Sequence, residues 1–206
     1  MSIDSIYKES INPELAKLGL KKRVSGIFTL DIAPGVLGWL GLNQASDHHA
    51  TGEFHINPVV GVRHQEIEKI VAECCNKEFH AYKGTTINRP IGYVMPENTY
   101  KTWDFTDANA DEAARDMAAA ISAHGIPFMR AHQGLAEIYD KMEKRYHAMD
   151  EALAMRRPIA LLLMGNPDRS LQALEAELAK LGARTDPAAA YFRSFADEFR
   201  KRLPPA

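Results

Sequence analysis

Four of the chain's eight histidines lie within one short stretch, and imidazole is the commonest metal ligand among side chains. The stretch SDHHATGEFHINPVVGVRH, residues 46–64, contains His48, His49, His55 and His64. Zinc sites need three or four converging ligands, and no pair of these histidines has the spacing of a known zinc motif. Two interpretations follow: a polar hairpin, or a metal-dependent hydrolase in which zinc or another divalent metal gains an oxygen ligand from Asp47 or Glu53.

The residues around His55 alternate between apolar and polar, as they do in a half-buried strand. This alternation places His55 and Asn57 on the face opposite the core, and the preceding segment places Trp39 and Asn43 on the same face. A large aromatic side chain among polar groups indicates a binding surface, or a face that the C-terminal helices cover. We therefore treat these four residues as candidates for contact with a partner.

A second candidate surface is charged. Arg156 and Arg157 follow a basic helical segment, which predicts either a solvated helix face or a surface for an acidic partner. The acidic residues Glu66, Glu68 and Glu73 are expected on the exposed side of an earlier helix. Nucleophile-elbow, phosphate-loop and dinucleotide-binding motifs are absent from the sequence, so it predicts no catalytic residue.

The composition is that of an ordinary globular protein, with 46% hydrophobic and 25% charged residues among 206. The formal net charge of −2 gives no bias toward nucleic acid. The longest apolar run is far shorter than the roughly 20 residues that a membrane span requires. The only cysteines, Cys74 and Cys75, are adjacent in a helical pattern, which favours reduced thiols and a cytoplasmic location.

These candidate residues must be positioned by strands and helices. Helical spacing predicts a first helix over residues 3–18, with Asn12 as a plausible cap and a break at Pro13. Three strands follow, over residues 24–32, 40–42 and 54–56, and then a helix over 65–75. Two more short strands are expected near 91–95 and 100–105, so residues 1–106 form a mostly antiparallel sheet of about five strands with helices on one face.

Helical patterns predict helices throughout residues 107–206. Expected segments are 107–124 with Gly125 as its stop, 127–145, 147–156, a short apolar helix after Pro158, 170–181 with Gly182 as its stop, and a last helix that Asp186 caps. The predicted fold class is therefore α+β, with an all-helical second half that forms one compact unit with the first.

The first 75 residues contain a pattern that resembles small bacterial domains of unknown function. The pattern is a helix closing in Asn12-Pro-Glu-Leu-Ala-Lys-Leu-Gly-Leu-Lys-Lys22, then a strand with Phe28, a strand with Gly38-Trp39 and the strand Phe54-His-Ile-Asn57. Some such domains are encoded beside polymorphic toxins, so the resemblance implies an immunity or interaction role. It transfers no active-site residue, and the long helical second half departs from the compact outline of these domains.

Taken together, these observations predict a cytoplasmic, non-enzymatic protein without a cofactor that binds another protein, as an immunity or regulatory factor. The metal-dependent hydrolase is the first alternative. A small-molecule-binding module, with its pocket between the sheet and the helical half, is the second. The sequence leaves the partner's identity and the oligomeric state open.

Overall fold

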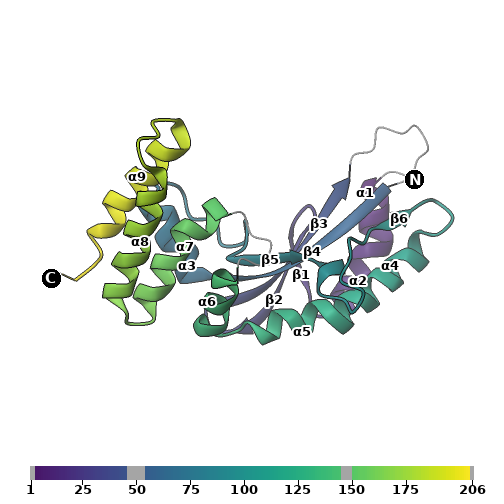
Figure 1. Ribbon diagram of the computed structural model, residues 1–206. Coiled ribbons are helices and arrows are strands. Elements are labelled where there is room, and N and C mark those ends of the chain that lie inside the picture. Colours follow the sequence, from purple (N-terminus) through teal and green to yellow (C-terminus); the bar gives the residue numbers. More distant parts are fainter. Residues whose placement is uncertain (1–2, 46–53, 145–149, 205–206) are drawn as a thin grey trace.

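The computed structural model describes residues 3–45, 54–144 and 150–204. Figure 1 shows a sheet with helices beneath it and a further group of helices at its left-hand end. The six strands of the described residues are β1 (Lys21–Val24), β2 (Ile27–Ala33), β3 (Val36–Ala45), β4 (Phe54–His64), β5 (Ile87–Pro90) and β6 (Trp103–Phe105). Their order is β1-β2-β3-β4-β5, and every pairing is antiparallel. The short strand β6 pairs with the beginning of β4, and β5 pairs with the later part of the same strand. The α+β prediction is confirmed, with six strands in place of about five.

The even-numbered residues of β2, β3 and β4 form the inner face of the sheet. Phe28, Leu40 and Val60 are at most 1% exposed and belong to one continuous hydrophobic core. Two long helical segments cover this face, and both lie on the same side of the sheet in Figure 1. They are residues 3–17, comprising α1 (Ile3–Ile6), a π-helical turn (Tyr7–Ile11) and α2 (Asn12–Lys17), and residues 110–131, comprising α4 (Ala110–Ala120), a second π-helical turn (Ile121–Gly125) and α5 (Ile126–Ala131).

Two helix breaks expected from the sequence do not occur. The first helix continues through Pro13 because a π-helical turn precedes it, and Asn12 lies inside the helix and does not cap it. Gly125 does not end its helix, since its lack of a side chain lets the helix pack closely on the sheet. A Cβ at Gly125 would lie 3.0 Å from Cγ1 of Val60.

Two strand predictions need correction. The expected strand over 24–32 is two strands, because Gly26 adopts a φ of +70° and closes a tight hairpin between β1 and β2. The expected strand at 91–95 lies a few residues earlier, as β5, and Ile91–Tyr93 forms a single 3₁₀ turn. The helix over 65–75 is confirmed as α3 (Gln65–Cys74).

The helical half is a set of short antiparallel helices. They are α6 (Leu135–Glu143), α7 (Asp150–Leu163), α8 (Pro167–Leu181) and α9 (Pro187–Arg200). Pro158 lies inside α7 and does not start a new helix, and its carbonyl oxygen accepts a hydrogen bond from Ser170 of α8. Gly182 ends α8 with a φ of +52°, and Asp186 caps α9 through the backbone N–H of Ala189, both as the sequence predicts.

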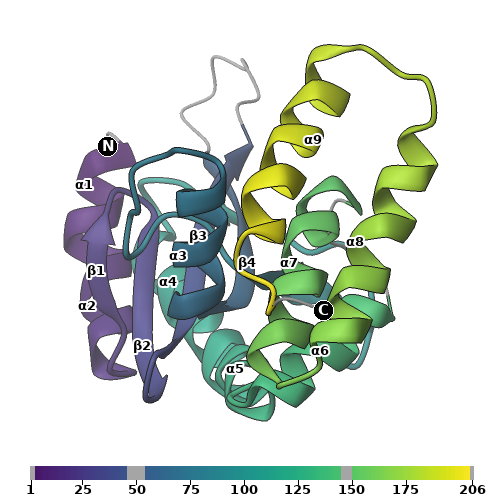
Figure 2. The same cartoon turned by 90° about the vertical axis from the view of Figure 1, so that its left-hand side faces the viewer.

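The two halves meet through α3. This helix follows directly from β4, and it packs against α7 and α9. Figure 2 shows β1 and β2 on one side of the molecule and α8 on the other. The C-terminal helices therefore sit at one end of the sheet and do not lie over its outer face.

Candidate functional site on the outer face of the sheet

Trp39 lies on the outer face of the sheet, as the alternation predicts, and its ring lies along the strand over Gly41. A Cβ at Gly41 would overlap Cη2 and Cζ3 of the ring, so only glycine leaves room for it there. The indole Nε1–H donates to the carbonyl oxygen of Tyr82 at 3.0 Å. The ring is half-buried, and this hydrogen bond together with the Gly41 backbone holds it in one orientation.

Apolar side chains and the cation of Arg23 lie near Trp39. The guanidinium of Arg23 lies 4.2 Å from the ring centroid of Tyr82 and donates through Nε to the buried hydroxyl of Thr29. Among the described residues, Arg23 forms no ion pair. Ile27 pairs with both Val24 and Gly41 across the strands, and Val24 is 46% exposed. We call the group Arg23, Val24, Ile27, Trp39, Asn43 and Tyr82 the Trp39 surface.

Sequence reasoning missed Tyr82 and Arg23. Tyr82 lies in a segment, residues 76–86, that has no regular periodicity, so nothing in the sequence places it over the sheet. Arg23 lies in an edge strand that the sequence did not separate from β2. These two residues, rather than the C-terminal helices, flank Trp39.

The other predicted outer-face residues have different surroundings. Asn43 is exposed. Asn57 faces outward but is only 6% exposed, because residues 97–102 cross it and the Lys101 carbonyl oxygen accepts from its Nδ2 at 2.6 Å. His55 Nδ1 lies 2.6 Å from Oδ1 of Asp104, its cross-strand neighbour on β6. Asn57 therefore stabilises the sheet from beneath a loop, while His55 and Asn43 lie nearer the solvent.

Of the four histidines that the sequence offers as metal candidates, His55 and His64 do not come together. They are nine residues apart along β4, or about 30 Å at the usual rise of an extended strand, and they point to opposite faces. His64 caps α3 instead, with Nδ1 accepting from the backbone N–H of Ile67 at 3.3 Å. Burial lowers the pKa of His64, which keeps this nitrogen unprotonated and able to accept.

The remaining metal candidates, His48, His49, Asp47 and Glu53, lie outside the described residues. Within the part of the chain that is described, no group of three or more His, Cys, Asp or Glu side chains is placed to hold a metal ion.

Arg156 and Arg157 do not form a solvated charged surface. Arg156 makes a bidentate ion pair with Glu68 of α3, at 2.7 Å for both Nε–Oε1 and Nη2–Oε2. Glu68 is 7% exposed, so its expected place on the open side of the helix is wrong. Arg157 is 8% exposed and donates through Nε and Nη2 to the carbonyl oxygen of Met142.

The buried cluster around Glu68 extends into the sheet. Arg63 lies 3.8 Å from Glu68 Oε2, and it donates to the carbonyl oxygens of His80, Lys83 and Gly84. It thereby holds residues 76–86, and with them Tyr82, against the outer face. The carboxylate of Glu68 compensates two buried guanidinium groups at once.

Two adjoining cavities lie in the helical half, not between it and the sheet as expected. One is about 450 Å³ in volume and lies among α6, α7 and α8. The other is about 530 Å³ and lies among α7, α8 and α9. Both are lined by Arg157, Glu177 and Lys180, so these charged residues mark where the cavities adjoin.

Comparison of the chain with protein-family models, with curated proteins and with solved structures finds no match in any of the three. The resemblance of the first 75 residues to small bacterial domains therefore stays a prediction. None of the helices in the described ranges is both long and apolar enough to cross a membrane.

Proposed function

We propose that the chain is a non-enzymatic protein that binds another protein through the Trp39 surface. The observation that carries this proposal is the fixed, half-exposed Trp39 ring, held over Gly41 by its hydrogen bond to the Tyr82 carbonyl. An aromatic side chain that is already ordered loses little conformational entropy on binding. Trp, Tyr and Arg are also the residue types that contribute most to the binding energy of protein interfaces.

The chemistry of the surface indicates the kind of partner. Val24, Ile27 and the Trp39 ring offer apolar contact area, and Arg23 offers a guanidinium that forms no ion pair within the described residues. A complementary partner presents an apolar protrusion with an Asp or Glu beside it. Such a carboxylate would accept a bidentate pair from Arg23, which its stacking on Tyr82 already orients.

An immunity or interaction role is the form of this function that the resemblance implies. If a toxin is encoded beside this chain, that toxin is the first partner to test. Purified Trp39→Ala and Arg23→Glu variants should each lose binding to it, by about tenfold or more for a central aromatic or charged contact.

The matched control is Leu171→Ala, which removes an exposed apolar side chain from α8, in the other half of the chain. It should bind the partner as the unmodified chain does, by calorimetry or surface plasmon resonance. Equal affinity of the Trp39→Ala variant and the unmodified chain, with both folded by circular dichroism, would contradict the proposal.

A further inference from the structure

The two cavities of the helical half differ in character, although they adjoin. Met155, Leu181, Ala188 and Phe192 line the larger one, whose walls are mainly apolar. The smaller one is lined by Tyr139, Gln172 and charged side chains. Each volume falls within the roughly 300–1,000 Å³ that is typical of small-molecule sites.

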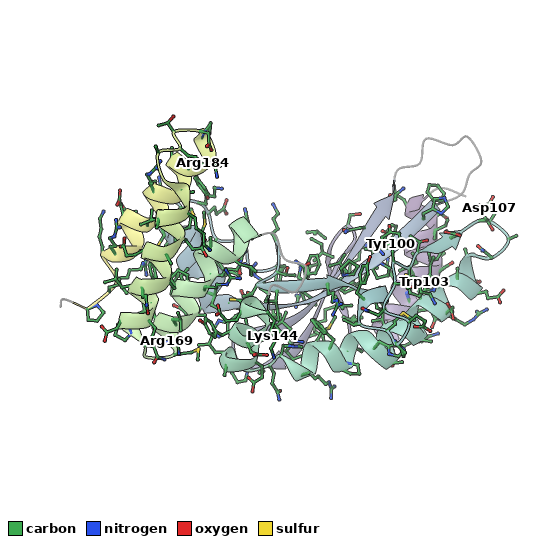
Figure 3. The ribbon with its side chains drawn as sticks, in the orientation of Figure 1. Tyr100, Trp103, Asp107, Lys144, Arg169 and Arg184 are labelled. Atoms are coloured by element: carbon green, nitrogen blue, oxygen red, sulfur yellow. The ribbon has the colours of Figure 1, made fainter. Side chains whose placement is uncertain are left out.

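The cavities also extend in different directions from the charged residues that they share. Arg169 lines the polar cavity and Arg184 the apolar one. Figure 3 shows these two arginines at opposite ends of the helical half. Tyr100, on the segment that crosses the sheet, lies well apart from both in the same view. The two cavities therefore extend toward opposite ends of the helical half.

Arg157 stands at the junction with unused hydrogen-bonding capacity. Its Nε and Nη2 donate to the carbonyl oxygen of Met142, which fixes the guanidinium. Its Nη1 makes no hydrogen bond to any described residue, and Oε1 of Glu177 lies 3.5 Å away. A side chain that is 8% exposed and lines both cavities thus directs N–H donors toward them. An oxygen acceptor from a ligand would satisfy these donors.

Cations outnumber carboxylates in the lining of the polar cavity. Lys180 Nζ lies 2.7 Å from the same Glu177 oxygen, so one carboxylate serves two cations. The polar cavity has the cations Arg157, Arg169 and Lys180 and the carboxylates Glu143 and Glu177. Arg169 forms no ion pair with a described residue. Arg157 Nε also lies 3.4 Å from Oε1 of Glu143, so both carboxylates of this cavity are already paired, and the one cation in excess favours a negatively charged ligand group.

We propose that this cleft binds a small amphipathic anion, with an acid group at Arg157 and Lys180 and an apolar body in the cavity among α7, α8 and α9. The shared chemistry is an alkyl chain that ends in a carboxylate or a phosphate. This site is independent of the Trp39 surface, since the two lie on different halves of the chain.

The test uses decanoate and decyl phosphate as probes, with decanol and decyltrimethylammonium as neutral and cationic controls. Isothermal titration calorimetry of the full chain should show saturable binding of at least one anionic probe, at least about tenfold tighter than either control, as expected for one charge-assisted hydrogen bond. Preference between the two anions identifies the acid group. Equal binding of the cationic probe, or no binding of either anion, overturns the proposal.

Two matched pairs of variants locate the binding. Ala188→Phe fills the apolar cavity from an exposed position on α9, whereas Ala190→Phe adds the same ring to the exposed surface outside it. Lys180→Gln removes a cation of the cleft that pairs with Glu177, and Lys201→Gln removes an equivalent cation that pairs with Glu198 at the same spacing.

Ala188→Phe and Lys180→Gln should each lower the affinity for the anionic probe by about tenfold, while Ala190→Phe and Lys201→Gln should leave that affinity unchanged. All four positions are exposed, so the variants are expected to fold, and thermal unfolding checks that they do. If both members of either pair lose affinity equally, the anion binds elsewhere and the proposal fails. If Trp39→Ala lowers the affinity for the anionic probe as much as Ala188→Phe does, the proposed location of the site is likewise contradicted.

Discussion

Glu68 of α3 and Arg156 of α7 join the two halves of the molecule by a bidentate ion pair, although they are 88 residues apart in the sequence. Their side chains are 7% and 15% exposed. The same carboxylate lies beside Arg63, which holds residues 76–86 on the outer face of the sheet. One buried carboxylate thus connects the helical half, the sheet and the segment that orients Trp39.

Glu68→Gln should destabilise the fold strongly, because it leaves Arg63 and Arg156 buried without a compensating charge. We expect a loss of about 3–5 kcal/mol in the free energy of unfolding, measured by urea denaturation. Glu73→Gln is the control. Its pair with Arg202 has side chains 40% and 39% exposed, so its loss should be only about 0–1 kcal/mol. Equal losses in the two variants would show that the Glu68 cluster does not hold the halves together.

Thr86→Val should remove two hydrogen bonds from the same cluster. The hydroxyl of Thr86 donates to Oε1 of Glu68 and accepts from the backbone N–H of His64, both at 2.9 Å. Valine keeps the shape and leaves a buried N–H without an acceptor, which should cost about 1–3 kcal/mol in the free energy of unfolding. Thr85→Val, at a neighbouring half-buried hydroxyl that accepts from Asn88, should cost clearly less. A smaller loss of stability in Thr86→Val than in Thr85→Val would contradict a stabilising role for the two hydrogen bonds of Thr86.

Gly41→Ala should displace the ring of Trp39 and break its hydrogen bond to Tyr82, because a Cβ at this position overlaps the ring. The chain has two tryptophans, so the change is measured in a Trp103→Phe background, where Trp39 is the only indole. We expect its fluorescence emission to move to longer wavelength as the ring enters water. Asn43→Ala, two residues along the same face, should leave the emission unchanged. An unshifted spectrum in the Gly41→Ala variant would mean that the ring does not lie over Gly41.

The stability of the fold should decrease between about pH 7 and pH 5, because burial lowers the pKa of His64 and of His132 below the ordinary value. A histidine with a lowered pKa stabilises the folded state in its neutral form. This contribution is complete above the unfolded pKa and is lost as the pH falls through it toward the folded pKa. Urea denaturation at the two pH values measures the decrease.

His64→Asn provides the control for this pH dependence. Asparagine is a good helix cap, so it keeps an acceptor for the N–H of Ile67 and removes the titrating imidazole. The variant should lose less stability than the unmodified chain between the two pH values, with the remainder due to His132. An unchanged pH dependence would assign the effect to other groups.

Local patterns in the sequence determined much of the fold. Alternation was enough to place Trp39, His55 and Asn57 on the outer face, because successive side chains of a strand must point to opposite sides. Asp186 and Gly182 marked helix ends correctly, since capping and positive φ depend only on neighbouring residues.

Tertiary structure alone decided what covers each residue. The sequence pattern of α3 gave Glu68 no reason to be buried, and only the packing of α7 against that helix pairs it with Arg156. Gly125 and Pro158 are ordinary helix breakers by local propensity, but both lie inside helical segments, where Gly125 packs close to Val60 and the Pro158 carbonyl accepts from Ser170. The candidate site follows the same rule: alternation turns Trp39 outward, whereas the distant carbonyl of Tyr82 and the buried Arg63 fix the orientation of its ring.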